Sequence, residues 1–482
     1  MAQQFSACST REQFFQTLAQ DIHLPPAEAD LLTGDFQALF DYYAAAGVPD
    51  NQALARLGSR PLQGFYDDRL PTVKYHNLFT DAWFPLSETR HNQNVWRVAA
   101  WLEEPVIPAV LQAAADLVLP DFPYFSTVLH HGFFWLDLWS VHRRIAVTPQ
   151  RQRPGAPLKE RRLPLFRVEY LPQAIVLEGR HALVDGNGCV LFMRALARTY
   201  LHLLGRELPP AVDSGITCSA QQFPTFQDVY GIPDSSQVPP SLQATRARHL
   251  AGKPALLQAA GYAALTIPTD RLLALAREQG VTVTALLSVP ILLAIRDCLD
   301  PKERRGRIKL AIPVNLHQYY PLDTLRNYSM YVNIELEPEQ VTDAAALLPE
   351  VARQLRTQNS PEVVGSMIGG FLKRAANPVL CALPAFFKWA TLSATRILFW
   401  EKRTMTAIFS NIGVIPEEFG GNLDRFGVAV SAVKPIRRKV TLTTLGNTAM
   451  LTITKTTHDD AFEQALEKRL TQIGLPPVFV EP

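Results

Sequence analysis

The stretch from residue 180 to residue 188, RHALVDGNG, constrains the fold of this chain more than any other part of its sequence. The apolar run Ala174–Leu177 lies just before it and predicts a β-strand. Apolar residues at helical spacing over Cys189–Leu204 predict a helix just after it. His181 is therefore placed at the end of a strand, with Asp185 four residues later. Because loops held between rigid elements often carry reactive groups, we expect a functional site here.

The residue types in this loop fit proton transfer. A neutral histidine such as His181 can take a proton from an alcohol or amine as that group attacks a carbonyl. Asp185 could orient the imidazole or could instead hold the loop, and spacing does not separate these roles. Gly186 allows close approach of a ligand or of the backbone. A hydrogen-bonded structural pair of histidine and aspartate fits the same residues.

The hexapeptide His181–Gly186 matches the HxxxDG motif of the CoA-dependent acyltransferase superfamily. That group includes chloramphenicol acetyltransferase, nonribosomal peptide condensation domains, polyketide-associated acyltransferases and alcohol acetyltransferases. Further segments agree in their order along the chain: 280–284, 312–316 with Asn327 downstream, and 410–413. The chain most resembles the alcohol acetyltransferase and polyketide-associated branch, and the resemblance covers about residues 76–475.

The resemblance implies an α/β fold of two chloramphenicol acetyltransferase-like lobes. Each lobe would hold a mixed sheet with helices, and the lobes would meet at a central tunnel. We expect a helical N-terminal extension over residues 1–75 and the lobe with the motif over 76–204. A proline-rich stretch over 205–260 predicts a crossover linker, and the second lobe would span 261–482.

The resemblance also implies roles for the motif residues. His181 would be the general base. Asp185 would be mainly structural, usually paired with an arginine. Gly186 would make room for a pantetheine arm or for the turn of the loop.

Other candidates lie in the second half of the chain. Asn411 would sit at the contact between the lobes near the tunnel. Donors for a tetrahedral oxyanion are needed, and the candidates are Ser410, Asn411, Tyr328 and Ser329. His317 stands where relatives commonly carry the arginine that pairs with the motif aspartate. Arg326 could replace that arginine as support for Asp185.

The expected reaction moves an acyl group from a thioester to a hydroxyl or amine. The donor would be acyl-CoA or a phosphopantetheinyl carrier protein, which makes an acyl carrier protein a candidate partner. No bound cofactor is expected. Two alternatives remain: a stand-alone condensation enzyme that forms an amide, and a non-catalytic scaffold that binds a carrier protein or an acyl ligand.

Composition and charge argue against several other classes of protein. A net charge of +2 argues against a nucleic-acid binder. Five scattered cysteines without metal-ligand spacing indicate neither a zinc site nor a disulfide framework, and favour a cytoplasmic setting. The N-terminus lacks the pattern of a signal peptide.

Two segments have alternative interpretations. The apolar segment Pro378–Trp400 is interrupted by Pro384, Lys388 and Arg396, so we do not expect it to span a membrane. A buried helix pair or the wall of an apolar channel is the main expectation, and peripheral membrane contact is the alternative. The basic stretch 143–167 fits a solvated hairpin or attraction of a phosphate-bearing substrate.

Overall fold

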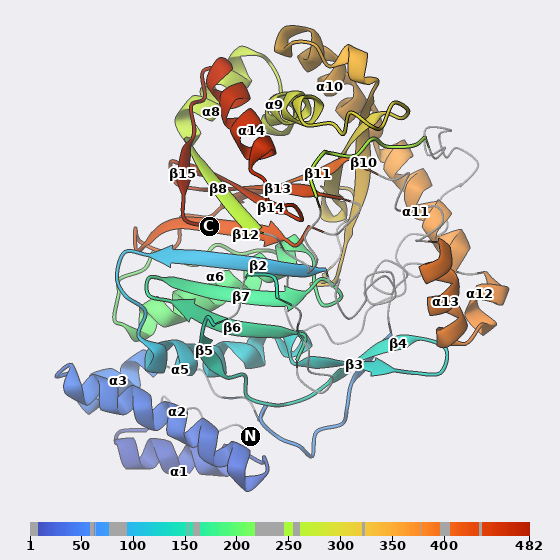
Figure 1. Ribbon diagram of the computed structural model, residues 1–482. Helices are drawn as coiled ribbons and strands as arrows, with labels where there is room; N and C mark the ends of the chain where they lie inside the picture. The colour runs from blue at the N-terminus through green and yellow to red at the C-terminus, as the bar shows by residue number, and fades with distance from the viewer. Residues whose placement is uncertain are drawn as a thin grey trace.

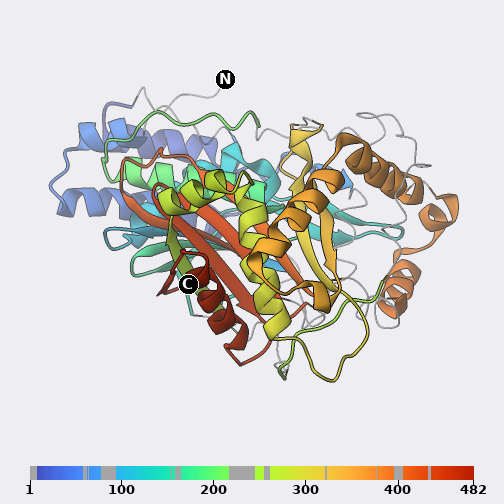
Figure 2. The same ribbon diagram turned by 90° about the horizontal axis from the view of Figure 1, so that it is seen from above.

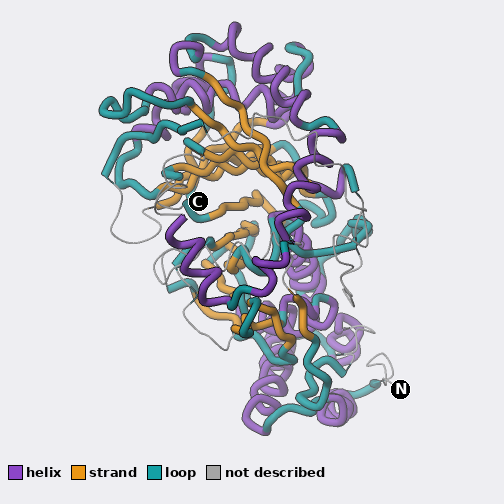
Figure 3. The backbone as a smooth tube through the Cα atoms, turned by 90° about the vertical axis from the view of Figure 1, so that its right-hand side faces the viewer, coloured by secondary structure: helices purple, strands orange, loops and turns teal. Residues whose placement is uncertain are grey.

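Two β-sheets face each other in the computed structural model, and helices cover their outer sides (Figure 1). Viewed from the side, the strands form the middle layers and the helices lie above and below them (Figure 3). The structure describes residues 8–57, 62, 64–76, 94–151, 154–156, 158, 164–216, 245–253, 261–320, 323–375, 377–395, 405–432 and 436–482. This is the mixed α/β architecture that the sequence predicts.

The first sheet has five strands in the order β12-β2-β7-β6-β5. Its central strands run antiparallel, and β5 runs parallel to β6. Every residue of β2 is buried, because the strand is covered on both faces. The strands are β2 (Val95–Leu102), β5 (Val147–Pro149), β6 (Phe166–Leu171), β7 (Ala174–Arg180) and β12 (Leu423–Val430).

Two layers of helices cover the outer face of this sheet. Helices α5 (Pro108–Val118) and α6 (Gly186–Leu203) pack against the strands. Outside them lie the three N-terminal helices, α1 (Arg11–Asp21), α2 (Pro26–Ala45) and α3 (Asp50–Leu57). Their buried aromatic and aliphatic side chains belong to the same core cluster as α5 and α6. The three N-terminal helices are therefore packed onto α5 and α6.

The second sheet has seven strands in the order β10-β9-β11-β13-β14-β8-β15. Strand β11 runs parallel to both β9 and β13, and the other pairs are antiparallel. The strands are β8 (Gly261–Pro268), β9 (Ile308–Asn315), β10 (Ser329–Leu336), β11 (Ala407–Ile415), β13 (Arg438–Leu445), β14 (Thr448–Lys455) and β15 (Val478–Val480). Seen from above, its helices lie over one face of the sheet (Figure 2). They are α8 (Thr269–Glu278), α9 (Val283–Asp297), α10 (Ala344–Gln358) and α14 (Ala461–Gln472).

One strand crosses between the halves of the chain. Strand β12 comes from the second half but pairs with β2 of the first sheet over Leu423–Val430. It also contacts β13 and β14 of the second sheet. The two sheets are thus joined by an exchanged strand. The predicted linker lies largely outside the described residues, which here are 205–216 and 245–253.

A peripheral layer lies beside both sheets. A small sheet has the order β1-β4-β3, formed by β1 (Lys74–His76), β3 (Thr127–His131) and β4 (Leu136–Ser140). Helices α11 (Pro361–Ala375), α12 (Pro378–Ala382) and α13 (Ala385–Thr395) follow one another close to it (Figure 1). Short 3-10 helices occur at Leu119–Asp121, Pro123–Phe125, Leu316–Gln318 and Pro338–Gln340.

The expectation of a buried helix pair over Pro378–Trp400 is wrong for the part that the structure describes. Phe386 and Phe387 of α13 are more than half exposed, whereas Lys388 beside them is buried. The aromatic side chains therefore point away from the core. Within the described residues no single helix is long and apolar enough to cross a bilayer, and only the bent pair α8–α9 meets that test by length and composition.

Candidate active site

A five-residue loop between β7 and α6 holds His181 in the interior. The strand ends at Arg180, and the helix begins at Gly186. The backbone N–H of His181 donates to the carbonyl of Asn94 at 2.7 Å, which fixes the start of the loop. Only 8% of His181 is exposed. The strand, loop and helix thus occur where the sequence predicts them.

Asn327 determines which nitrogen of His181 carries the proton. Its side-chain Nδ2 donates to the backbone carbonyl of His181 at 2.7 Å. This bond turns its Oδ1 toward the ring, where it lies 2.7 Å from Nδ1 of His181. Because an amide oxygen can only accept, Nδ1 is the protonated nitrogen. The lone pair is therefore on Nε2, the tautomer that a general base requires.

The surroundings keep this imidazole neutral. Burial lowers the pKa of His181 to about 4, because a charged ring would lose its hydration. The positive charge of Lys439 lowers the pKa further, while bonding to Asn327 opposes the shift. The ring is consequently unprotonated and able to accept a proton throughout the neutral pH range.

Lys439 reaches this region from the second sheet. Successive side chains of β13 point to opposite faces of the sheet. Arg438 points outward to Glu463 of α14, with its Nε 2.9 Å from the carboxylate. Lys439 lies on the opposite face, which looks toward the first lobe. On that face Thr443 donates to the carbonyl of Phe426 on β12 at 2.6 Å.

The ammonium group of Lys439 is itself perturbed. Only 7% of the residue is exposed. Burial lowers the pKa of Lys439 to about 7. A buried lysine thus shares the interior between the sheets with His181. Sequence spacing does not identify Lys439, and only the alternation of β13 signals which way it points.

Asp185 caps the helix and ties the loop to the second half of the chain. Its Oδ1 accepts from the backbone N–H groups of Asn187 at 3.0 Å and Gly188 at 3.2 Å. Its Oδ2 accepts from the backbone N–H of Tyr328 at 3.0 Å. One carboxylate therefore holds the first turn of α6 and the segment that carries Asn327.

The glycines of the motif allow this close packing. A Cβ on Gly188 would lie 2.6 Å from the carbonyl oxygen of Leu325, which is backbone and cannot yield easily. A Cβ on Gly186 would lie 2.7 Å from the side chain of Ile412 on β11. Gly186 thus faces the other lobe. The role in accommodating a pantetheine arm stays a prediction.

The two candidates on β11 lie side by side at a β-bulge. Asn411 donates to Oγ1 of Thr284 on α9 at 3.0 Å and accepts from the N–H of Gly413 at 3.0 Å. The register between β11 and β13 shifts between Asn411 and Gly413, whose φ of 97° favours glycine. Ser410 is half-buried and lies opposite Thr441. Asn411 therefore holds the bulge to α9 within the second lobe.

The remaining candidates lie around the start of β10. Tyr328 is buried, and Ser329, which begins β10, is half-buried. Arg326 is 2% exposed and directly precedes Asn327. Nδ1 of His317 lies 2.8 Å from Oδ1 of Asn315, and its ring packs against Tyr328. The roles of Arg326 and His317 as supports of Asp185 stay predictions.

The structure thus brings His181 and Asp185 together with the segment 326–329. Asn327 is the residue whose role sequence reasoning misses. The sequence places it downstream of Asn315, but its partner lies 146 residues away. No spacing rule connects residues at that distance, so the pairing can be found only from the fold.

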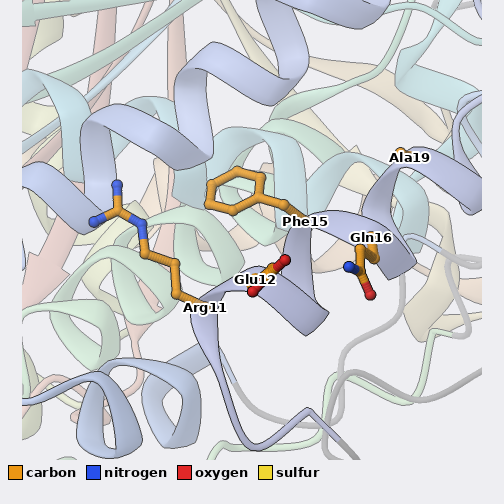
Figure 4. A pocket seen from close by; sticks show the side chains of 5 residues that line it. All are labelled: Arg11, Glu12, Phe15, Gln16 and Ala19. Carbon is orange, nitrogen blue, oxygen red and sulfur yellow. The ribbon is translucent and has the colours of Figure 1, made fainter.

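Within the described residues no cluster of three or more histidine, cysteine or acidic side chains could hold a metal ion. A surface hollow on α1 is lined by Arg11, Glu12, Phe15, Gln16 and Ala19 (Figure 4). Arg11 there is paired with Asp41 at 2.9 Å. This hollow lies on the outermost helical layer and contains none of the candidate residues.

Removing the carboxylate of Asp185 should destabilise the protein by about 2–4 kcal/mol, because a helix cap and the partner of a buried N–H are both lost. Urea denaturation of Asp185→Ala measures this. Asp343→Ala is the matched control, since Asp343 caps α10 at the surface through Ala346 alone. That control should cost about 1 kcal/mol. Equal decreases in the free energy of unfolding for the two variants would contradict the anchoring role of Asp185.

Comparison with solved structures identifies the fold. No protein-family model matches the sequence, and comparison with curated proteins yields no match. Trichothecene 15-O-acetyltransferase from Fusarium sporotrichioides superposes with a TM-score of 0.53 at 11% identity, covering 83% of this chain and 94% of that one. TRI101 of the same organism, solved with coenzyme A and T-2, gives 0.57 at 10% identity over 85% and 100%. The chain has the fold of the CoA-dependent acyltransferases and condensation domains.

The same fold includes a condensation domain. The first condensation domain of the calcium-dependent antibiotic synthetase gives a TM-score of 0.53 at 13% identity, covering 83% of this chain and 95% of that domain. Because these identities are low, the likeness establishes the fold alone, which acetyltransferases, condensation domains and an epimerization domain share. The particular reaction has to be argued from the site.

Proposed function

We propose that this chain is an acyltransferase that moves an acyl group from a thioester to a hydroxyl or amine acceptor, with His181 as general base. The bond between Nδ1 of His181 and Oδ1 of Asn327 carries the proposal. It leaves Nε2 as the proton acceptor, in a ring that burial keeps neutral. The acyltransferases that share the fold support the same chemistry.

The proposed reaction proceeds in two stages. Nε2 of His181 takes the proton of the acceptor as its oxygen or nitrogen attacks the thioester carbonyl, giving a tetrahedral oxyanion. When the carbonyl re-forms, the carbon–sulfur bond breaks and the imidazolium returns the proton to the leaving thiolate. The products are the acylated acceptor and free thiol. The candidate side-chain donors to the oxyanion are Ser410, Asn411, Tyr328 and Ser329, and Asn411 has a second N–H beside the one that it donates to Thr284.

The donor and acceptor are tested directly. The protein is incubated with acetyl-CoA or longer acyl-CoAs and with a series of alcohols and amines. Thiol release and the mass of the product are followed. Transfer from CoA without added carrier protein supports a CoA-dependent enzyme, whereas transfer only from a pantetheinylated carrier protein supports a carrier-dependent one.

Amide condensation is the second candidate, favoured by the likeness to a condensation domain over 95% of that domain. An aminoacyl donor and an amine acceptor distinguish it, because the product then contains a new amide bond. A protein that binds acyl thioester but releases no thiol with either acceptor class is a scaffold rather than an enzyme. That result would overturn the proposal.

The value of kcat/KM for acyl transfer should stay constant as the pH falls from neutral to mildly acidic. Because the pKa of His181 is about 4, kcat/KM is expected to be flat from about pH 8 to pH 5 and to fall below that. A solvent-exposed histidine has a pKa of about 6.5 and would lose activity near that pH. A pH profile with a stable thioester measures this. A fall centred near pH 6.5 would contradict the buried, neutral histidine.

Lys439→Met provides the internal control for this profile. Removing the positive charge favours the imidazolium, so the pKa of His181 should rise and the acidic limb should move to higher pH. The limb should stay below about pH 6.5, the pKa of an exposed histidine, because burial of His181 is the larger cause. An unchanged limb would show that Lys439 does not act on His181.

A further inference from the structure

Five large aromatic side chains are exposed where the β3–β4 hairpin meets α13. They are Phe133, Phe134, Phe386, Phe387 and Trp389, which we name the aromatic patch. Each is between 43% and 72% exposed. Contiguous exposed apolar surface of this kind marks an interaction site rather than ordinary surface.

Backbone contacts join the two parts of the aromatic patch into one surface. The N–H of Ala385, the first residue of α13, donates to the carbonyl of Phe133 at 2.8 Å. Phe133 and Phe134 pack edge to face with ring centroids 4.8 Å apart. The ring centroid of Phe386 lies 5.7 Å from that of Phe387. The tip of the β3–β4 hairpin and α13 thus lie side by side (Figure 1).

Helix α13 buries its charge and exposes its aromatic rings, the reverse of an ordinary surface helix. Its only lysine, Lys388, is 5% exposed. The ammonium donates to the carbonyl of Phe134 at 2.9 Å and lies 3.3 Å from the ring centroid of Trp135. Phe386 and Phe387, the two residues before Lys388, point outward instead. A helix that turns its cation inward and its aromatic rings outward fits an apolar partner and not water.

The charge of this part of the chain selects the kind of partner. Residues 363–400 contain no aspartate or glutamate, and besides the buried Lys388 their sequence contains Lys373, Arg374 and Arg396. The hairpin tip, residues 132–135, is also free of acidic residues. Phenylalanine and tryptophan rings enter the boundary between headgroups and acyl chains, and neighbouring basic residues are attracted to anionic lipid. A negatively charged lipid bilayer matches both properties.

We propose that the aromatic patch docks this protein onto the surface of an anionic lipid bilayer. The rings of the hairpin tip and of α13 would insert at the headgroup level without any segment crossing the membrane. Strand β7, which leads to His181, ends toward the side of the molecule where α11–α13 and the hairpin lie (Figure 1). The proposal does not rest on acyl transfer, because it concerns binding alone.

Vesicle sedimentation tests the docking. The full chain is mixed with vesicles of phosphatidylcholine alone or with about 30 mol% phosphatidylglycerol, the composition that provides a negative surface. We expect binding to the anionic vesicles, weakened by added salt. The variant Phe133→Ser/Phe386→Ser should reduce the partition coefficient about tenfold or more, because two inserted rings are lost. Absence of binding by the unmodified protein would overturn the proposal.

Val478→Ser/Phe479→Ser is the matched control. These side chains on β15 are 63% and 46% exposed and lie on the second sheet, away from α13. This control should bind vesicles as the unmodified protein does. If both double variants lose binding equally, the aromatic patch is not the docking surface. Circular dichroism and thermal melting confirm that each variant is folded.

Two further measurements separate a bilayer from other occupants. Brominated lipids should quench the fluorescence of the protein, and quenching should decrease in Trp389→Phe, because Trp389 would lie among the lipids. Unchanged quenching would contradict the proposal. Light scattering after gel filtration detects self-association. A dimer that the Phe133→Ser/Phe386→Ser variant converts to a monomer, without vesicle binding, would show that a second copy covers the aromatic patch.

Discussion

Replacing His181 by alanine is expected to lower kcat/KM for acyl transfer by about 10²- to 10⁴-fold, the usual contribution of a general base. The fold should persist, because the loop is still held by Asp185 and by the backbone bond to Asn94. Thiol release from an acyl-CoA in the presence of excess acceptor measures the loss.

His249→Ala is the matched control for that variant. His249 is also partly buried and hydrogen-bonded, with Nδ1 2.9 Å from Glu303, but it lies outside the site. Its loss should leave kcat/KM close to that of the unmodified protein. If His181→Ala retained comparable activity, the base would have to be another group. If both variants lost activity together with stability, the effect would be structural.

Replacing Glu178 by alanine should have the largest effect on stability, about 3–5 kcal/mol, because the buried Arg97 loses its carboxylate partner and Arg167 keeps only Glu169. Glu178 is fully buried on β7, three residues before His181. Its Oε1 accepts from Arg97 at 3.0 Å and from the N–H of Gly155 at 2.9 Å. Its Oε2 accepts from Arg167. Both arginines would lose this carboxylate.

Denaturation in urea measures that loss, and Glu350→Ala provides the comparison. Glu350 pairs with Arg353 at 2.6 Å, but the side chains are 35% and 60% exposed. Breaking such an exposed pair should cost less than about 1 kcal/mol. Similar losses for the two variants would show that burial adds nothing to the Glu178 pair. The activity of Glu178→Ala should decrease in proportion to the fraction of the protein that remains folded.

Local sequence patterns predict the elements around the loop correctly. The apolar run before the motif becomes β7, and the helical spacing after it becomes α6. These predictions succeed because strand and helix periodicities report which face of one element is buried. The helix start is readable as well, since Asp185 caps α6 directly. The placement of His181 at the end of a strand needs no tertiary information.

Long-range pairing cannot be predicted in this way. The contact of Asn327 with His181 joins residues 146 apart, and it depends on how the two halves of the chain pack. The exchange of β12 into the first sheet has the same origin. Neither the Asn327–His181 contact nor the β12–β2 pairing produces a periodic pattern in the sequence. The segments involved would have the same residue pattern if they packed against other partners.

Apolar composition is also misleading where burial is concerned. The segment over Pro378–Trp400 is expected inside the protein, yet Phe386, Phe387 and Trp389 are exposed. Hydrophobicity reports a preference to leave water and does not say which surface the side chain will contact. Lys388 is buried on the same helix because a carbonyl and an aromatic ring are available to its ammonium.

The sequence by itself determined the loop, the histidine and the helix that follows, because these depend on neighbours along the chain. Only the tertiary structure decided the state of that histidine. Asn327 arrives from the start of β10 to bind Nδ1, and Lys439 arrives from β13 to add positive charge. Burial between the two sheets then lowers the pKa of His181 to about 4. The loss of water around a side chain is a property of the packed lobes and not of any short stretch of sequence.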